Sequence, residues 1–344
     1  MNFIGQSYSF LHSAAKERTI FMKDYLQLIA VFAVLLLLIP CVGYARRESE
    51  KAAAGSPQGY ETVKILCEET GRVAEYSMKD YIIGAVFAQM PADFEDEALK
   101  AQAVLASTYA RRRILAESAE PAAELRGAHM SDDGSRYQAF FTEDQAREVY
   151  GEGYGAALKK ITAAAEYAEP LTLSWQGEPI LVAFHGISYG KTESAQVMWG
   201  EEIPYLTSVD SEWDAELEEC ETVRNYSEAE MKKLLAAEFT DCDLSGEPEG
   251  WLTAAERSPG GTVLKMRAGG EICEASRICA LLDLPSQHIE VEYADGEFTC
   301  RALGCGHLVG MSQHGANEMA KQGSSCEEIL LHYFTGCELL RSTA

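Results

Sequence analysis

Residues 81–110 decide the fold of this chain, and they read YIIGAVFAQMPADFEDEALKAQAVLASTYA. The first part is an apolar helix that runs into Pro91. Because a proline disfavours helical geometry in the residue before it, this helix should end near Met90. A second helix should begin at residues 95–97, whose acidic side chains suit a helix N-terminus. Its apolar face is narrow and made of small residues, so we expect two closely packed helices that hold Gln89 at their corner.

The same stretch resembles the stage II sporulation protein D family of cell-wall lytic transglycosylases. In that family a helix ends in Glu-Met-Pro, an aromatic residue follows three positions on, and the chain continues as Glu-Ala-Leu-Lys-Ala-Gln-Ala-Val. The matching residues here are Met90, Pro91, Phe94 and residues 97–104. The glutamate before Met-Pro is the family's catalytic acid, and in this chain Gln89 stands there. The resemblance also places Lys100 among the substrate-binding residues.

A second signature of the family lies at residues 185–194, HGISYGKTES. The family pattern is a strand followed by His-Ser-x-x-Gly-Gly-Lys/Arg-Thr-Glu and then Trp-Gly. This chain has Gly186 for the serine and Tyr189 for a glycine, and its Trp-Gly pair is at 199–200. Polar side chains at a strand end beside a tryptophan suit a carbohydrate cleft, where hydroxyl groups need hydrogen bonds and sugar rings need aromatic faces. Without the resemblance, the same residues would indicate an ordinary loop.

The third signature lies at residues 304–316, GCGHLVGMSQHGA. It resembles the family's Gly-His-Gly-Val-Gly-Met-Ser-Gln-Tyr-Gly-Ala, with Leu308 for a glycine and His314 for a tyrosine. Glycines in this run permit tight turns around a cavity. From the second and third signatures, the resemblance implies that the substrate-binding residues are His185, Lys191, Trp199, His307, Ser312 and Gln313.

The chemistry that the resemblance implies is cleavage of peptidoglycan glycan strands. A glutamic acid protonates the glycosidic oxygen, and the muramyl 6-hydroxyl attacks its own anomeric carbon, leaving a 1,6-anhydro end. Gln89 is nearly isosteric with glutamate but has no proton to donate, although it can hydrogen-bond a sugar. One hypothesis is an impaired or rescued enzyme, with Asp93 as the nearest substitute carboxylate and Glu97 and Glu193 as others. The second hypothesis is a non-catalytic glycan-binding or amidase-enhancing scaffold.

Composition excludes one class of partner. Acidic residues outnumber basic ones 54 to 29, which gives a net charge of −25. Nucleic-acid binding needs clustered lysine and arginine, so we expect no nucleic-acid partner. The family implies instead glycan strands, a sporulation amidase and a membrane protein as partners.

The N-terminal part suggests a membrane anchor. Residues 1–24 are short and mixed, and residues 25–45 are apolar and uncharged from Leu28 onwards. That length is close to the roughly 20 apolar residues that span a bilayer. A cleaved signal peptide is the alternative, and we favour an uncleaved single-pass anchor in the cytoplasmic membrane. Residues 46–59 are a linker, and residues 60–340 form the domain, which the resemblance places on the extracytoplasmic side.

No cofactor or metal is expected. Nine cysteines follow Cys41 of the anchor, and none forms a Cys-x-x-Cys motif, so zinc spacing is absent. Some family members hold zinc with one histidine and two cysteines in the loop after the second helix. Here His129 is retained, but Ser131 and Tyr137 stand where the cysteines would be, and Gln138-Ala139-Phe140 resembles the family's Gln-Ala-aromatic. We expect His129 to be an exposed loop histidine.

The expected fold class is α+β, since helices and short strands are interspersed without a regular βαβ repeat. The family implies a single domain with a cleft between helical and strand-rich parts. Strands are expected at 61–66, 74–78 and 262–267, and hairpins at 171–184 and 288–301. Helices are expected at 143–168, 227–237, 271–282 and 326–333; the second has the capping-box pair Ser227 and Glu230.

Overall fold

The computed structural model describes residues 62–342, all of which belong to one compact unit, Ser56–Ala344. The predicted N-terminal segment 1–24, anchor 25–45 and linker 46–59 lie outside the described residues. Within the described part of the chain, no helix combines the length and the apolar character that crossing a membrane requires.

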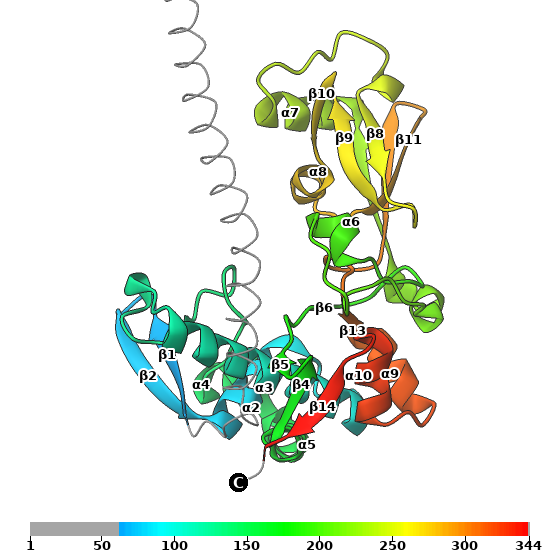
Figure 1. The fold of residues 1–344 in the computed structure, drawn as a ribbon. Coiled ribbons are helices and arrows are strands. Elements are labelled where there is room, and N and C mark those ends of the chain that lie inside the picture. The colour runs from blue at the N-terminus through cyan, green and yellow to red at the C-terminus, as the bar shows by residue number, and fades with distance from the viewer. Residues whose placement is uncertain (1–61, 343–344) are drawn as a thin grey trace, which may run out of the picture. The chain divides into compact units, whose positions relative to one another are not determined.

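Two helices carry the stretch that decides the fold (Figure 1). Helix α2 (Met78–Gln89) ends where Met90 adopts an extended backbone before Pro91, as the steric demand of proline on its predecessor predicts. Helix α3 (Asp96–Ala119) follows after Glu95, with acidic residues in its first turn. Both predicted boundaries are confirmed.

Helix α3 is the centre of the first hydrophobic core. Ala101, Ala103 and Ala106 are fully buried, and such small side chains let neighbouring elements approach the helix closely. The elements packed against α3 are α2, α5 (Tyr154–Ala168), α9 (Gln313–Lys321), α10 (Cys326–Tyr333) and β4 (Leu171–Trp175). The predicted helix at the C-terminal end is confirmed as α10.

Three small sheets border this core. Their strands are β1 (Thr62–Cys67) between β2 (Arg72–Ser77) and β3 (Met130–Ser131), then β4 between β5 (Glu178–Pro179) and β14 (Glu338–Arg341), and finally β6 (Phe184–His185) with β13 (Met311–Ser312). The β6–β13 pair is parallel, with Ser312 opposite His185. This short pairing brings the second and third sequence signatures together.

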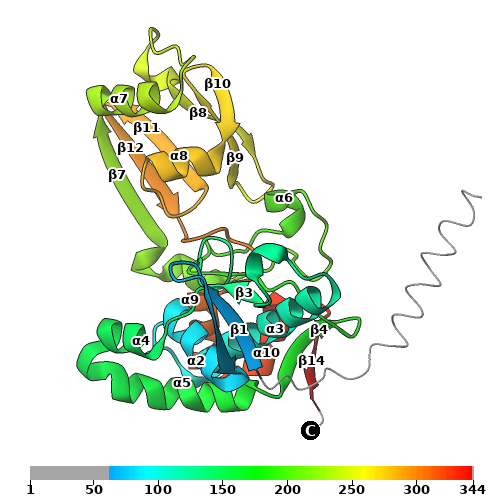
Figure 2. The ribbon, with the colours of Figure 1, turned by 90° about the vertical axis from the view of Figure 1, so that its left-hand side faces the viewer.

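A second hydrophobic core is built mostly from strands. Its elements are the sheet β11 (His288–Ala294), β12 (Glu297–Leu303) and β7 (Glu221–Ser227), the sheet β10 (Glu271–Glu274), β9 (Val263–Ala268) and β8 (Leu252–Arg257), and helices α7 (Glu228–Glu238) and α8 (Ala275–Leu281). Figure 2 shows β7, β12 and β11 side by side. The mixed helices and small sheets confirm the α+β class, and the capping box of Ser227 and Glu230 is present at α7.

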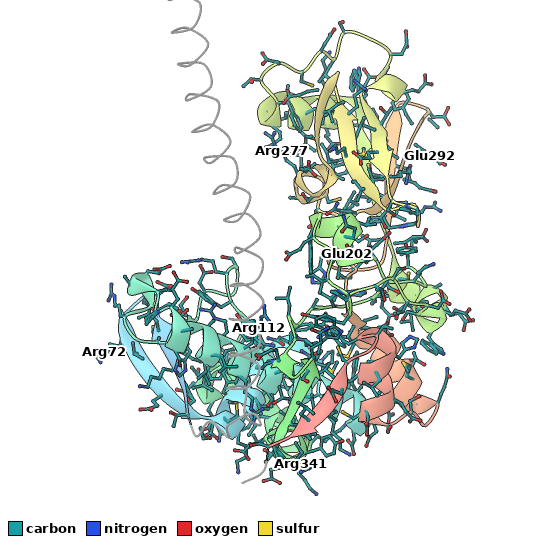
Figure 3. All side chains as sticks on the ribbon, viewed as in Figure 1. Arg72, Arg112, Glu202, Arg277, Glu292 and Arg341 are labelled. Atoms are coloured by element: carbon teal, nitrogen blue, oxygen red, sulfur yellow. The ribbon has the colours of Figure 1, made fainter. Side chains whose placement is uncertain are left out.

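The remaining elements are α4 (Glu143–Tyr150), α6 (Ala195–Trp199) and the 3-10 turns Ala123–Leu125, Gly151–Gly153, Glu212–Glu216, Glu218–Cys220 and Pro248–Gly250. Charged side chains such as Arg72, Glu202 and Glu292 project from the surface (Figure 3). The cysteines of residues 62–342 are all free thiols, and five of the nine are buried, where a free cysteine packs as a small hydrophobic side chain.

Three predicted elements differ from the structure. The single helix predicted at 143–168 is two helices, because Gly151 ends α4 with φ 51° and a 3-10 turn follows. The helix predicted at 271–282 is wrong in its first turn, where residues 271–274 pair with β9 as a strand. In the predicted hairpin at 171–184, the second strand is shorter than expected: within this stretch only Glu178–Pro179 pair with β4, whose other edge pairs with β14.

Candidate functional site

Gln89 ends α2, and protein groups hold both ends of its half-buried amide. Its Nε2 donates to the carbonyl oxygen of Ala139 at 2.8 Å. Its Oε1 accepts from Gln102 Nε2 at 2.8 Å and from Gln138 Nε2 at 3.1 Å. The position of the family's acid therefore carries an amide whose nitrogen and oxygen are both engaged and whose orientation is defined.

A second amide behind Gln89 supports that arrangement. Gln313, the first residue of α9, is only 8% exposed. Its Nε2 donates to the backbone carbonyl of Gln89 at 2.8 Å and to Gln102 Oε1 at 3.2 Å. The third signature thus meets the first at Gln89, but Gln313 contacts the protein where the resemblance implied a contact with substrate.

The loop before α4 supplies the other side of the site. The hydroxyl of Tyr81 donates to Gln138 Oε1 at 2.7 Å, and the backbone N–H of Gln138 donates to the hydroxyl of Tyr109 at 3.2 Å. These contacts fix Gln138 so that its amide nitrogen faces Gln89. In the sequence, this loop matches the family's Gln-Ala-aromatic pattern, but no role was predicted for Gln138. The signal that could have indicated a role is that Gln138 is a polar residue inside a matched motif.

Gln89 lines two pockets. The larger has a volume of about 720 Å³ and runs over the Pro91–Asp93 turn and along α4 and α5, with Tyr150 and Lys160 among its lining residues. The smaller, of about 300 Å³, is lined by Gln138, His307 and other residues of the neighbouring loops. Gln89 is a lining residue that the two pockets share. No residue of the second core lines either pocket.

His185, His307 and Trp199 come together at the smaller pocket's side of the site. The ring centroids of His185 and His307 are 6.0 Å apart, and those of Trp199 and His307 are 5.5 Å apart in an edge-to-face contact. Burial, with a smaller contribution from His307, lowers the pKa of His185 to about 3, so its ring is neutral near pH 7. Trp199 is 42% exposed and offers its ring to solvent.

The three candidate substitute carboxylates lie in different surroundings. Asp93 is exposed and lines the larger pocket together with Gln89. Glu97 is bound to Lys100 Nζ at 2.6 Å and accepts from the backbone N–H of Cys326 at 2.8 Å. Glu193 is 3% exposed and lines neither pocket. Of the three, only Asp93 shares a pocket with Gln89.

Lys100, Lys191 and Ser312 line neither of the two pockets at Gln89. Besides its pair with Glu97, Lys100 lies over the ring of Tyr167. Lys191 is exposed on the segment that follows β6. The hydroxyl of Ser312 accepts from the backbone N–H of Gly315 at 3.1 Å as the cap of α9.

The loop that holds zinc in some family members is built differently here. His129 is half-buried, contrary to the prediction of an exposed residue, because its Nδ1 accepts from the backbone N–H of Lys64 at 3.1 Å. Ser131 is buried in β3, and Tyr137 lines the smaller pocket. Within residues 62–342, no three histidine, cysteine or acidic side chains gather as metal ligands would.

Comparison with known proteins agrees with these signatures. The family described as Stage II sporulation protein matches residues 67–173. Stage II sporulation protein D of Bacillus amyloliquefaciens is 32% identical over 339 residues, which cover 92% of this chain and 96% of the relative. The protein of the same name from Bacillus subtilis strain 168 is 30% identical over 343 residues, covering 94% and 97%.

A more distant relative carries a different name. The amidase enhancer of Bacillus subtilis strain 168 is 24% identical over 304 residues, which cover 74% of this chain but 40% of that protein. The similarity to the two sporulation proteins, by contrast, extends over nearly the whole of both chains. With three signatures in order along the sequence and two of them joined at Gln89 in the structure, the chain belongs to the stage II sporulation protein D family.

Proposed function

We propose that this protein binds peptidoglycan glycan strands across Gln89 and cleaves them poorly. The observation that carries the proposal is that Gln89 lines two pockets, with its amide held by Ala139, Gln102 and Gln138. A long polysaccharide needs an extended site, and adjoining pockets offer one. Trp199 and His307 supply an aromatic and a polar surface beside it.

The impairment follows from the chemistry of the lytic transglycosylase reaction. The acid gives its proton to the glycosidic oxygen as the bond to the anomeric carbon breaks. The muramyl 6-hydroxyl oxygen then bonds to that carbon, and its proton returns to the carboxylate, so no water is consumed. An amide at position 89 supplies neither transfer. Since general acid–base catalysis contributes about 10²–10⁴-fold, little turnover should remain.

An assay on glycan strands without stem peptides tests both halves of the proposal. We expect the purified protein to co-sediment with such strands, and to release far fewer 1,6-anhydromuramyl ends than an active family member at equal concentration. Absence of binding would overturn the proposal. A normal rate of release would show that another carboxylate acts as the acid, and Asp93→Asn would then identify or exclude the one that shares a pocket with Gln89.

A non-catalytic role as an amidase-enhancing scaffold is the second candidate. It is favoured by the similarity to the Bacillus subtilis amidase enhancer and by Gln89 itself, since a scaffold needs no acid. In this case the protein would raise the rate at which a sporulation amidase removes stem peptides. That rate, measured with and without the protein and with Gln89→Ala, separates the roles: a scaffold keeps its effect in the variant.

We propose further that residues 25–45 anchor the chain once in the cytoplasmic membrane, with the domain on the extracytoplasmic side, where it would meet glycan strands, an amidase and a membrane partner during engulfment. The uncharged apolar run from Leu28 supports an anchor. N-terminal sequencing of the mature protein tests this directly. A sequence that begins shortly after Ala45 would show a cleaved signal peptide instead.

A further inference from the structure

The groups around the amide of Gln89 form a fixed pattern of donors and acceptors. We propose that Gln102, Gln138, Gln313 and the carbonyl of Ala139 are a socket that fixes the orientation of the side chain at position 89, and that the Ala139 carbonyl in this socket requires a proton there. In this chain the amide carries that proton permanently. A carboxyl group at position 89 would be held in its protonated form near neutral pH. The role of this socket in catalysis rests on the proposed function. The experiment that tests the socket itself does not depend on that function.

The direction of every hydrogen bond in the socket is set by two backbone carbonyls, which can only accept. Gln313 presents its nitrogen to the carbonyl of Gln89 and therefore to Gln102 Oε1, so Gln102 presents its own nitrogen to Gln89. On the opposite side, the carbonyl of Ala139 lies 2.8 Å from Gln89 Nε2. Gln89 Oε1 therefore faces Gln138, which presents its nitrogen to it, and the hydroxyl of Tyr81 then donates to Gln138 Oε1. With the amides in this one set of orientations, every hydrogen bond of the socket joins a donor to an acceptor.

A neutral carboxylic acid fits this pattern, and an ionised one does not. The acid's carbonyl oxygen would replace Gln89 Oε1 and keep both amide donors, while its O–H would donate to Ala139. In the carboxylate the second oxygen would face the Ala139 carbonyl at close to 2.8 Å with no proton between them. A hydrogen bond that only the neutral form can make raises the pKa of an acid, and partial burial acts in the same direction. The amide donors of Gln102 and Gln138 act in the opposite direction, but the neutral form keeps both of them, so the contact with the Ala139 carbonyl decides the sign.

The other charged and titratable groups around position 89 do not reverse this expectation. Those that line the two pockets are Asp93, Tyr150 and Lys160 in the larger, and Tyr109, Tyr137 and His307 in the smaller. The charge of Asp93 opposes ionisation of a neighbouring acid. Lys160 favours ionisation, but its ammonium group donates to the carbonyl of Phe94 at 2.6 Å and lies 3.7 Å from Asp96.

The socket gives Gln102, Gln138 and Gln313 the role of positioning residues. They contact position 89 through its side chain or backbone. The socket also gives a role to the Gln138-Ala139 pair of the loop. Gln138 donates to the side-chain oxygen of Gln89, and the carbonyl of Ala139 accepts from the side-chain nitrogen of Gln89. A protonated carboxyl held at this corner is the form that a general acid must have before the reaction begins.

The pKa of a carboxyl placed at position 89 tests the inference in the full chain. Infrared difference spectra between Gln89→Glu and wild type, taken across a pH series, report the protonated carboxyl band of the single added group. We expect a pKa at least about 2 units above the usual value of about 4.3 for glutamate. The matched control is Gln196→Glu, at an exposed position, which should titrate near the usual value. Equal pKa values in the two variants would overturn the proposal.

Thermal stability gives a second readout of the same proton. An acid whose pKa is higher in the folded than in the unfolded state stabilises the fold least when ionised. The Tm of Gln89→Glu relative to wild type should therefore fall as pH rises from about 4 through the pKa of the folded state, and level off above it. A difference that stays constant or rises with pH would contradict the socket.

A variant of the loop tests Gln138 itself. In the Gln89→Glu background, Gln138→Leu removes a donor that stabilises the ionised form more than the neutral one, so the pKa should rise further. An unchanged pKa would show that Gln138 does not contact position 89 in solution. None of these measurements uses glycan, so a raised pKa in a protein that fails to bind glycan would refute the proposed function and leave the socket standing.

Discussion

Gln89 and Glu193 are two inward-facing polar side chains whose partners differ in kind. Gln89 faces a carbonyl oxygen of Ala139, which demands a donor. Glu193 is 3% exposed and accepts from the hydroxyl groups of Tyr189 at 3.0 Å and Ser258 at 2.7 Å, both of which are donors. The comparison teaches that the chemistry of the partners, more than burial, determines which side chain each position can hold.

The two positions also differ in what surrounds them. The partners of Gln89 belong to the first core and its loops, and Gln89 lines two pockets. The partners of Glu193 join that region to the second core, because Tyr189 stacks on His288 with ring centroids 3.9 Å apart and Ser258 follows β8. We therefore interpret Glu193 as a structural link and Gln89 as a ligand-facing position.

The largest expected effect is a gain of cleavage in Gln89→Glu. If the socket and pockets are otherwise complete, restoring the acid should raise the release of anhydromuramyl ends by about 10²–10⁴-fold. Two further residues differ from the family pattern: Tyr189, and Ser107, where the family usually has an arginine. Neither obstructs this gain, because Ser107 donates to the carbonyl of Leu171 and Tyr189 stacks on His288, and neither lines a pocket with Gln89.

The control for this gain is Gln89→Ala, which removes the amide and adds no acid. It should bind glycan less tightly than wild type and cleave no faster. If wild type already cleaves at a normal rate and Gln89→Ala leaves that rate unchanged, Gln89 is not at the reaction centre. Another carboxylate of the chain would then act as the acid in place of position 89.

Glu193→Ala should lower stability without changing the site. The substitution leaves the hydroxyl of Tyr189 without its acceptor and removes one partner of Ser258, and hydrogen bonds to charged groups contribute about 1.5–3 kcal/mol. Denaturant unfolding measures the loss, and Glu202→Ala, at an exposed residue labelled in Figure 3, should stay within about 0.5 kcal/mol of wild type. Glycan binding lost while the fold is intact would contradict a purely structural role.

Local signals predicted the parts of the fold that local chemistry determines. Pro91 fixed the end of α2, and the pair Ser227 and Glu230 fixed the start of α7. The helix predicted at 271–282 failed because residues 271–274 gain more from pairing with β9 than their helical propensity offers. The sequence shows a glycine at position 151 but does not show that the helix ends there. The φ of 51° that ends α4 is a property of the folded backbone.

The sequence predicted which residues belong to the candidate site, but not which of them contact one another. The signatures identified Gln89, and matched segments contained Gln102, Gln138 and Gln313. Which of these contact one another depends on tertiary packing, since Gln313 and Gln89 are 224 residues apart in sequence. For the same reason Gln313 was assigned to substrate, while its amide is turned to the backbone of Gln89. Residue type alone does not distinguish a group that touches the ligand from one that positions it.

His185 extends the comparison to a buried base. Its folded pKa of about 3 lies below the ordinary value of 6.5, so the unfolded state binds more protons as pH falls below 6.5 and the fold loses stability in that range. Between pH 7 and pH 5 we expect this residue to account for about 2 kcal/mol of lost stability. The measurement is the difference in pH dependence between wild type and His185→Gln; equal slopes would show that His185 is not buried as a neutral ring.

Trp199→Ala should give the smallest effect and tests whether the ligand-facing side extends beyond Gln89. The ring is 42% exposed and contacts His307 edge to face, at a centroid distance of 5.5 Å, so little packing is lost and the fold should remain stable. If a sugar ring stacks on the exposed face, glycan affinity should fall on the order of tenfold, which corresponds to about 1.4 kcal/mol. Trp199→Phe should retain most of the affinity, because it keeps an aromatic face.

Titration of glycan strands against wild type and the two variants measures both changes in affinity. Equal affinities in all three would restrict glycan contact to the two pockets at Gln89, whereas a loss in Trp199→Ala that Trp199→Phe restores would extend the contact surface to α6.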